Sequence, residues 1–245
     1  MNAERTDRIG FGDLRLIQRP EDFCYGVDAV ILADFAASGV KASGLVMDLG
    51  TGNGIIPLIL SHKTKANRIF GLEVQEETYQ IASKNVHENG LEGRVSILFG
   101  NVKDIGLTFC PELTGTVDVV VSNPPYMASQ SGLTNSNHAK TIARHETAGD
   151  LFDFLNASAR LLKIKGHLYM VHRPNRMVDL FCLARQVGLE PKELRLVCPK
   201  NGAAPNILLV HFLKGGGKEL KILPNLDVYG QDGEYTKEIL AIYEK

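Results

Sequence analysis

A glycine-rich turn carries the first residues able to do chemistry. The run Asp48-Leu49-Gly50-Thr51-Gly52-Asn53-Gly54 follows the short apolar stretch Leu45–Met47 and opens a helix expected over residues 54–62. Alternate glycines allow a tight turn and let a ligand approach backbone N–H groups at the start of that helix. The spacing differs from the G-x-G-x-x-G of dinucleotide-binding proteins. An acid two residues before the first glycine suits the ammonium of an amino-acid moiety, so no pyrophosphate is expected.

A second acid follows the next strand. Glu73 lies near the end of a strand expected over residues 68–74, where a carboxylate is placed to hold the ribose hydroxyls of a nucleoside. An amino acid joined to a nucleoside describes S-adenosyl-L-methionine. The two acids and the turn therefore predict a site for this cofactor.

A proline motif follows the wholly apolar strand expected over residues 117–121. In Asn123-Pro124-Pro125-Tyr126, two prolines fix the backbone and remove two donors, so the segment presents acceptors to the cofactor pocket. The Asn123 side chain and the Pro124 carbonyl would hold the two hydrogens of a planar amino group and make its nitrogen more nucleophilic. Tyr126 would stack on the planar substrate, as aromatic side chains do on extruded bases. We expect these four residues to form the catalytic site.

Together these motifs resemble the class I methyltransferases that modify planar nitrogens. Further segments are similar to the bacterial valine-tRNA adenine-N6-methyltransferase family over nearly the whole chain: residues 23–30, Arg144-His145-Glu146, Val171-His172-Arg173-Pro174, and the tail from Val228-Tyr229 to Ile242-Tyr243. The resemblance implies methylation of the N6 amino group of an adenine in tRNA, with the base flipped into the pocket. It also implies a Rossmann-like fold.

One position departs from the pattern of such enzymes, which commonly carry an acid after the third strand to contact the adenine of the cofactor. Asn101 occupies that place here. Its amide can still bond the ring amino group, and Val102 can donate its backbone N–H. The residues expected to bind the cofactor are Asp48, Gly50, Thr51, Gly52, Asn53, Gly54, Glu73, Val74, Asn101, Val102 and Asn123.

Other functions fit parts of the pattern. The proline motif serves a protein glutamine amide equally well, but enzymes of that type usually carry a helical domain ahead of the core, and only about forty residues precede the first core strand here. Guanine N2 in RNA is a further target, although such relatives often have phenylalanine at position 126. A catalytically idle module that binds RNA or S-adenosylmethionine has no physical need to keep Asp48, Glu73, Asn123 and Tyr126 together.

Strand and helix patterns alternate from Gly44 onward, which predicts a doubly wound α/β fold with its site at the carboxyl ends of the strands. We expect a seven-stranded, mostly parallel sheet with an antiparallel pair at one edge. Strands are expected at 45–47, 68–74, 95–99, 117–121, 166–171, 194–197 and 207–212, with helices at 27–37, 54–62, 75–89, 151–162 and 174–187. Residues 1–43 are expected to form a hairpin and a helix capped near Asp28, residues 44–214 the methyltransferase core, and residues 215–245 a packed tail.

Composition and charge limit the class of protein and the kinds of partner that the sequence allows. The 245 residues are 44% hydrophobic and 22% charged, which excludes disordered and fibrous classes. Four dispersed cysteines and no metal-ligand spacing predict neither disulfides nor a metal site, and a cytoplasmic location is expected. Residues 160–221 hold twelve Lys or Arg against four acids in a chain of net charge −1, which predicts an RNA-facing patch. The polar stretch 127–149 is expected to act as a lid.

Overall fold

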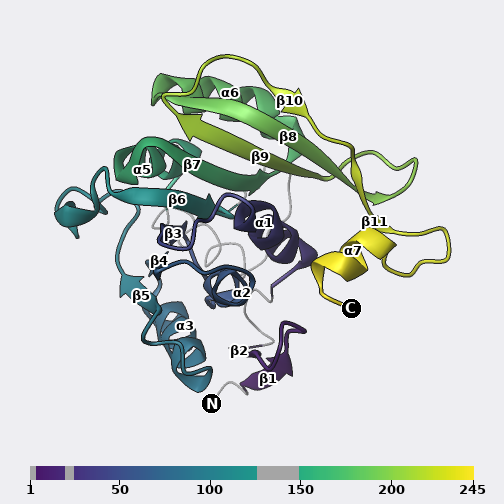
Figure 1. Cartoon of the computed structure of the whole chain (residues 1–245), viewed down its shortest axis with the longest axis horizontal. Coiled ribbons are helices and arrows are strands. Elements are labelled where there is room, and N and C mark those ends of the chain that lie inside the picture. The colour runs from purple at the N-terminus through teal and green to yellow at the C-terminus, as the bar shows by residue number, and fades with distance from the viewer. Residues whose placement is uncertain (1–3, 20–24, 126–148) are drawn as a thin grey trace, which may run out of the picture.

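A nine-stranded sheet runs through the centre of the protein, seen here in a computed structural model that describes residues 4–19, 25–125 and 149–245 (Figure 1). Along the sheet the strands are β10 (Lys221–Ile222), β8 (Leu189–Lys200), β9 (Ile207–Lys214), β7 (Leu162–His172), β6 (Val117–Ser122), β3 (Leu45–Leu49), β4 (Arg68–Glu73) and β5 (Val95–Phe99), and β11 (Leu226–Tyr229) also pairs with β8. Strands β7, β6, β3, β4 and β5 are parallel neighbours, whereas β9 lies antiparallel between β7 and β8. The predicted doubly wound fold is confirmed.

The sheet has two strands more than the seven expected from the sequence. The additional strands, β10 and β11, come from the tail and pair in parallel with β8. They are only two and four residues long, and both residues of β10 are exposed; β11 alternates between buried and more exposed residues, but over too few positions to predict a strand. Strand β8 is also longer than expected, since it continues through Pro191 at an irregularity in its pairing with β9. Proline is tolerated at such irregularities because no ladder donor is needed there.

Helices cover both faces of the sheet. They are α1 (Val27–Ala37), α2 (Ile55–Lys63), α3 (Glu76–Glu88), α5 (Leu151–Leu161), α6 (Met177–Gln186) and α7 (Lys237–Ile242), with short 3-10 turns at Pro111–Leu113 and Pro174–Arg176. Successive strand residues point to opposite faces, so Val46 packs in one apolar core with α1 and α2, while Met47 packs in the other with α5 and α6. Packing between two helical layers therefore holds the carboxyl ends of the parallel strands together at one end of the sheet.

The start of α1 differs from the expected cap. The residue before its first turn is Gly26, which makes no side-chain cap, and Asp28 lies inside the first turn. The Asp28 carboxylate accepts a hydrogen bond of 2.9 Å from the backbone N–H of Ala29. The helix begins earlier than a capping role for Asp28 requires because Val27 already adds to its buried, apolar surface.

The ends of the chain pack on the core. Strands β1 (Arg5–Arg8) and β2 (Arg15–Gln18) form an antiparallel hairpin that lies beside α3 (Figure 1). In the tail, α7 contacts α1, and the ring of Tyr243 stacks on that of Phe11 at 6.0 Å between centroids. In the part of the chain that is described, no helix is long and apolar enough to cross a membrane.

Candidate functional site

A cavity of about 470 Å³ lies at the carboxyl ends of β3, β4 and β6. This is the edge at which ligands bind in doubly wound sheets, and the volume falls within the usual range for small-molecule sites. Eight of the eleven predicted cofactor-binding residues lie on its wall: Gly50, Thr51, Gly52, Asn53, Glu73, Val74, Val102 and Asn123. Pro124 and Pro125 lie on the same wall. Most of the predicted cofactor and catalytic residues are thus brought to one cavity, whereas Asp48, Gly54 and Asn101 do not line it.

The glycine-rich turn is fastened to the end of β4. Gly50, Gly52 and Gly54 have φ angles of 74°, 58° and 84°, a left-handed region that favours glycine. The N–H groups of Gly50 and Thr51 both donate to the Leu72 carbonyl, at 3.0 and 2.9 Å. The sequence argument expected such donors to face a ligand, but these two are used within the fold. A Cβ at Gly52 would meet nothing within 4 Å, so this face of the turn is open to a ligand.

Asp48 lies in β3 and is fully buried rather than on the cavity wall. Neither of its carboxylate oxygens has a hydrogen bond of good geometry within the described ranges, but the hydroxyl of Thr51, which does line the cavity, lies close enough to act on Asp48 as a hydrogen-bond donor. Burial raises the pKa of Asp48 to about 7; the Thr51 hydroxyl nearby opposes this rise, and the charge of Glu73 adds to it. Unpartnered buried polar atoms are costly, so this pair is suited to a donor entering the cavity.

Glu73 is 6% exposed and joins the two strand ends. One carboxylate oxygen, Oε2, accepts from the N–H of Gly52 at 3.0 Å, and the other, Oε1, accepts from the N–H groups of Val74 and Gln75 at 3.0 and 2.9 Å. Burial raises the pKa of Glu73, and these three hydrogen bonds oppose the rise. A carboxylate oxygen has about two acceptor sites, so Oε2 retains one for a ribose hydroxyl while Oε1 is fully used.

The third strand contributes less than expected. Val102 lines the cavity, but Asn101 does not, and its side-chain oxygen accepts a hydrogen bond of 2.9 Å from the backbone N–H of Lys103. The geometry therefore favours Val102 over Asn101 as the contact for an adenine ring. The role of Asn101 stays a prediction.

The proline motif separates the large cavity from a second one of about 260 Å³. Pro124 and Pro125 line both cavities, whereas Asn123 lines the large one only. Asp150, Leu151, Phe152, His172, Arg176 and Leu183 complete the second wall. Tyr126, the segment predicted to be a lid and the run Arg144-His145-Glu146 lie outside the described residues.

Sequence reasoning missed several wall residues. Gln18, Arg19 and Tyr25 come from the N-terminal segment, and Phe154 from α5. No local motif marks them because they reach the cavity only through long-range packing. The sequence did contain one sign of the residues that support this part of the wall. Asn85 lies among the buried apolar positions of α3, where asparagine is unusual.

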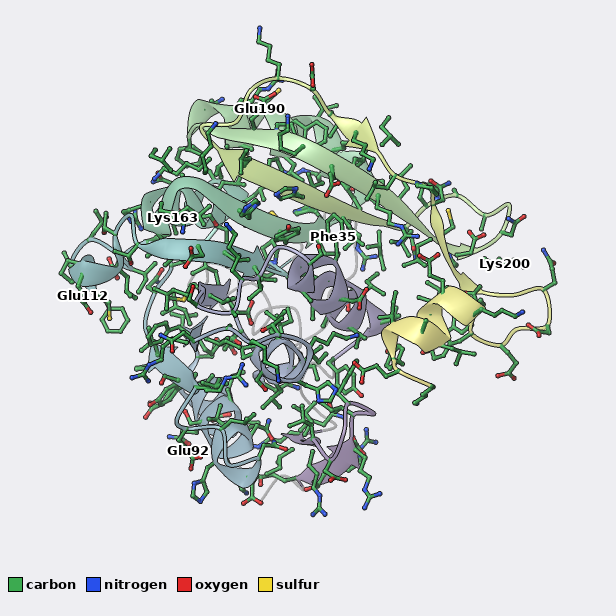
Figure 2. All side chains as sticks on the ribbon, viewed as in Figure 1. Phe35, Glu92, Glu112, Lys163, Glu190 and Lys200 are labelled. Carbon is green, nitrogen blue, oxygen red and sulfur yellow. The ribbon has the colours of Figure 1, made fainter. Side chains whose placement is uncertain are left out.

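The basic stretch does not form one face. Lys163 lies at the amino end of β7 and pairs with Asp118. Lys200 lies at the carboxyl end of β8, which is the opposite end of the strands, and Figure 2 shows the two residues far apart. Several other cations of the stretch bind carbonyls or acids of the fold, among them Arg160, Lys165, Arg185, Lys192, Arg195 and Lys214. Arg173, Arg176 and Lys200 lie at or just after the carboxyl ends of β7 and β8, on the cavity side, where Arg173 also donates to the Asn206 carbonyl and Arg176 pairs with Asp179. The cations of residues 160–221 therefore do not all share one face, because successive strands carry them to opposite ends of the sheet, and an RNA-facing patch stays a prediction for those on the cavity side.

In the described ranges, no group of three or more His, Cys, Asp or Glu side chains is placed to hold a metal ion. The cavity is lined by glycines, one carboxylate, one guanidinium, hydroxyls, amides and apolar side chains.

Comparisons with known proteins show the family to which this chain belongs. Residues 26–188 match the family model described as "Methyltransferase small domain". The chain belongs to this methyltransferase family. As a methyltransferase it is an enzyme that transfers a methyl group, in line with the expectation from the turn and the proline motif. The family match spans α1 through α6 and so includes every element that lines the two cavities except the N-terminal hairpin.

Curated relatives share most of the length of this methyltransferase. It is 28% identical over 222 residues to "tRNA1(Val) (adenine(37)-N6)-methyltransferase" of Bacteroides fragilis, with 90% of each chain covered. It is 29% identical over 228 residues to the protein of the same name from Pasteurella multocida, covering 89% of this chain and 86% of the relative.

Solved structures confirm the fold. A predicted O-methyltransferase from Agrobacterium tumefaciens is similar with a TM-score of 0.71 at 18% identity, covering 89% of this chain and 95% of that one. TYW2 of M. jannaschii in complex with AdoMet is similar with a TM-score of 0.57 at 15% identity, covering 87% and 86%.

Proposed function

We propose that this methyltransferase uses S-adenosyl-L-methionine to methylate the N6 amino group of an adenine in tRNA. The observation that carries the proposal is the position of Asn123-Pro124-Pro125 between two cavities, one of which holds the predicted cofactor residues. The names of the curated relatives support adenine N6 and tRNA as the target. Because tRNA is its substrate, we infer that the enzyme acts in the cytoplasm.

The residues of the large cavity fit the cofactor. The Thr51 hydroxyl on the wall and the Asp48 carboxyl buried directly behind it together suit an ammonium, and Gly52 leaves room for a ligand to approach closely. One acceptor site of Glu73 is open for a ribose hydroxyl. Leu72, Val102 and Phe154 give the apolar part of the wall that an adenine ring requires. When bound, S-adenosylmethionine supplies the methyl group.

The proline motif would orient the target nitrogen. The side-chain oxygen of Asn123 and the carbonyl of Pro124 are acceptors for the two hydrogens of an exocyclic amino group. Proline has no backbone N–H, so positions 124 and 125 offer no donor that would compete for these acceptors. Holding the amino group in line with the methyl group provides most of the rate by positioning, without a covalent nucleophile.

The second cavity would receive the RNA side of the target. Phe152 is 37% exposed on its wall, beside Arg176. An exposed aromatic ring is a stacking surface for a base, and a guanidinium binds phosphate. Arg173 and Lys200 lie at the same edge of the sheet, so we infer that the RNA backbone crosses this edge.

Incubation with labelled S-adenosylmethionine and total tRNA, protein extract or DNA tests the substrate class. We expect label in tRNA, and N6-methyladenosine after nucleoside digestion. Label in protein alone would replace the proposal with glutamine methylation, and N2-methylguanosine would replace adenine with guanine. Binding of S-adenosylmethionine without label in any of the three pools would favour an idle module.

A further inference from the structure

Gln18 is a polar residue of the large cavity that the cofactor motifs do not include. It ends β2, is 4% exposed and lies on the cavity wall. Its Nε2 donates a hydrogen bond of 2.6 Å to the carboxylate of Asp7. A carboxylate only accepts, so the amide must present its nitrogen to Asp7 and its oxygen elsewhere. That oxygen is buried and has no partner in the part of the chain that the structure describes.

The hairpin that carries Gln18 is docked by two asparagines of α3 and its C-terminus. The Oδ1 of Asn85 accepts from the N–H of Ile17 at 2.6 Å, and its Nδ2 donates to the Ile17 carbonyl at 2.9 Å. Asn89 repeats the arrangement with Arg15, accepting at 2.9 Å and donating at 2.8 Å. Each asparagine thus pairs with one residue of β2 as a neighbouring strand would. We call Asn85 and Asn89 the asparagine ladder.

The asparagine ladder fits β2 because the spacing of residues four apart on a helix nearly equals the spacing of residues two apart on a strand. Residues four apart on a helix rise about 6.0 Å, and residues two apart on a strand rise about 6.6 Å. Asn85 and Asn89 are four apart and face Ile17 and Arg15, which are two apart. The match satisfies the outer backbone edge of β2 without another strand and fixes its register, so that Gln18 is held at the cavity.

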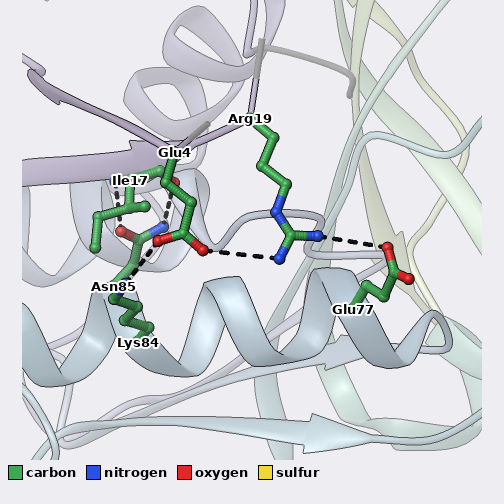
Figure 3. Close-up of polar contacts among 6 residues, drawn as sticks. All are labelled: Glu4, Ile17, Arg19, Glu77, Lys84 and Asn85. Atoms are coloured by element: carbon green, nitrogen blue, oxygen red, sulfur yellow. Dashed lines mark hydrogen bonds and ion pairs between the residues drawn. The ribbon is translucent and has the colours of Figure 1, made fainter. Parts of the chain in front are cut away.

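The same amide reaches the cofactor turn. Asn85 forms a third hydrogen bond. Its Nδ2, which donates to the Ile17 carbonyl, also donates to the Asn53 carbonyl at 2.9 Å. Ion pairs join the hairpin to α3 on either side: Glu4 with Lys84 at 2.6 Å, and Arg19 with Glu77 at 3.4 Å (Figure 3). These pairs are partly exposed and contribute little by themselves. Asn85 is fully buried, so its three hydrogen bonds carry the connection between hairpin and turn.

We propose that Gln18 binds the cofactor, its side-chain oxygen accepting a hydrogen bond from a donor of S-adenosylmethionine, and that Asn85 and Asn89 are the residues that position it. The inference rests on the proposed assignment of the large cavity to the cofactor. A site of this kind needs an acceptor that is desolvated and fixed before the ligand arrives, and the unpartnered oxygen of Gln18 meets both conditions.

Calorimetric binding of S-adenosylhomocysteine, without RNA, tests the contact. Gln18→Met keeps the length of the side chain and removes the acceptor, and we expect about tenfold weaker binding or more. Unchanged affinity in a folded Gln18→Met protein would overturn the proposal. Repeating the titration with 5′-methylthioadenosine, which lacks the amino-acid end, assigns the donor: a loss confined to S-adenosylhomocysteine identifies the ammonium, and a loss with both ligands identifies the nucleoside.

A double-mutant cycle tests the positioning role. Asn89→Asp places a carboxylate oxygen against the Arg15 carbonyl and undoes one rung of the ladder, although Asn89 does not line the cavity. We expect it to weaken binding in the wild-type background and to have no further effect in Gln18→Met, because its influence passes through Gln18. Equal losses in both backgrounds would overturn the positioning role. These measurements need no methylation, so a failure to modify tRNA would contradict the proposed substrate and leave this inference standing.

Discussion

The hydroxyl of Ser122 donates a hydrogen bond of 2.9 Å to the carbonyl of Leu49, and this bond joins the ends of β6 and β3 where the two functional motifs begin. Ser122 is fully buried, and the next residue is Asn123. Leu49 in turn precedes the first glycine of the cofactor turn. This side-chain bond adds to the backbone pairing of β3 with β6, in which Leu49 lies opposite Ser122, and helps to fix the acceptor for the target amino group relative to the turn.

We expect Ser122→Ala to lower kcat more than it changes the affinity for S-adenosylhomocysteine. The substitution removes one buried hydrogen bond, worth about 1 kcal/mol of stability, and loosens the segment that carries Asn123. Steady-state methylation of tRNA and thermal unfolding are the measurements. Ser158→Ala is a matched control, since its buried hydroxyl donates to the Phe154 carbonyl within α5. Equal effects of both substitutions on kcat would contradict the role of Ser122.

Asn123→Ala is expected to lower kcat about a hundredfold or more and to change KM little, because its acceptor acts as the nitrogen becomes nucleophilic. The strand that precedes it keeps its packing, so the unfolding temperature should stay close to that of the wild type. Single-turnover methylation of tRNA checks the rate. A normal rate would remove Asn123 from the mechanism.

Tyr126 carries a separate prediction, from its sequence position beside the motif. Tyr126→Phe keeps the ring and should be mild, whereas Tyr126→Ala should lose the stacking of the base, about 1–3 kcal/mol. The comparison of KM for tRNA between the two variants is decisive, and equal losses would assign the role to the hydroxyl instead.

Glu73→Ala is expected to weaken S-adenosylhomocysteine binding about tenfold or more, because it removes an acceptor for the ribose. It also leaves the N–H groups of Gly52, Val74 and Gln75 without their partner, so the unfolding temperature should fall as well. Calorimetry at a temperature where the variant is folded separates the two effects. Glu112→Ala removes an exposed acid from the 3-10 turn Pro111–Leu113, away from the cavity wall, and should leave the affinity unchanged.

The binding of S-adenosylhomocysteine should tighten with pH. Burial raises the pKa of Asp48 to about 7, so its carboxyl is mostly neutral at pH 6 and mostly ionised at pH 8. A ligand ammonium favours the ionised form, and binding then releases a proton. We expect the dissociation constant to fall about tenfold between these pH values and to level off above them. Asp48→Asn should bind with no such pH dependence, and a retained pH profile would assign it to another group.

The tRNA surface is tested by two single charge reversals at opposite edges of the sheet. Lys200→Glu, at the cavity edge, should weaken tRNA binding and reduce its salt slope by about one or more. Lys218→Glu is equally exposed but lies where Lys192 binds the Lys218 carbonyl, at the far edge, and should leave the slope unchanged. The reverse order of effects would move the RNA to that edge.

The sequence predicted those parts of the site that lie within one strand and the turn after it. Glu73 and the run from Gly50 to Gly54 reach the same cavity because parallel strands end at one edge, a rule that needs no tertiary detail. The position of Asp48 behind the wall was not predictable, because a strand residue is placed by the twist and packing of its neighbours. The same is true of the use of the Gly50 N–H by Leu72.

The N-terminal contribution could not be predicted for a different reason. Gln18 becomes a wall residue only because Asn85, 68 positions after Ile17, docks its strand. Local patterns show a hairpin and an amphipathic helix but not that the two meet. Likewise, the net charge of residues 160–221 says nothing about which edge each strand brings its cations to.

The asparagine ladder also constrains the order in which the protein folds. Strand β2 gains its side-chain partners from positions 68 and 74 residues later in the chain, so it stays undocked on a growing polypeptide until α3 has been synthesised and has packed on β5. Closing so long a loop costs entropy that the hairpin alone does not offset. The wall that Gln18 gives to the cavity is thus made from residues that are synthesised well before α3, yet it can be completed only after the turn and the second acid are in place.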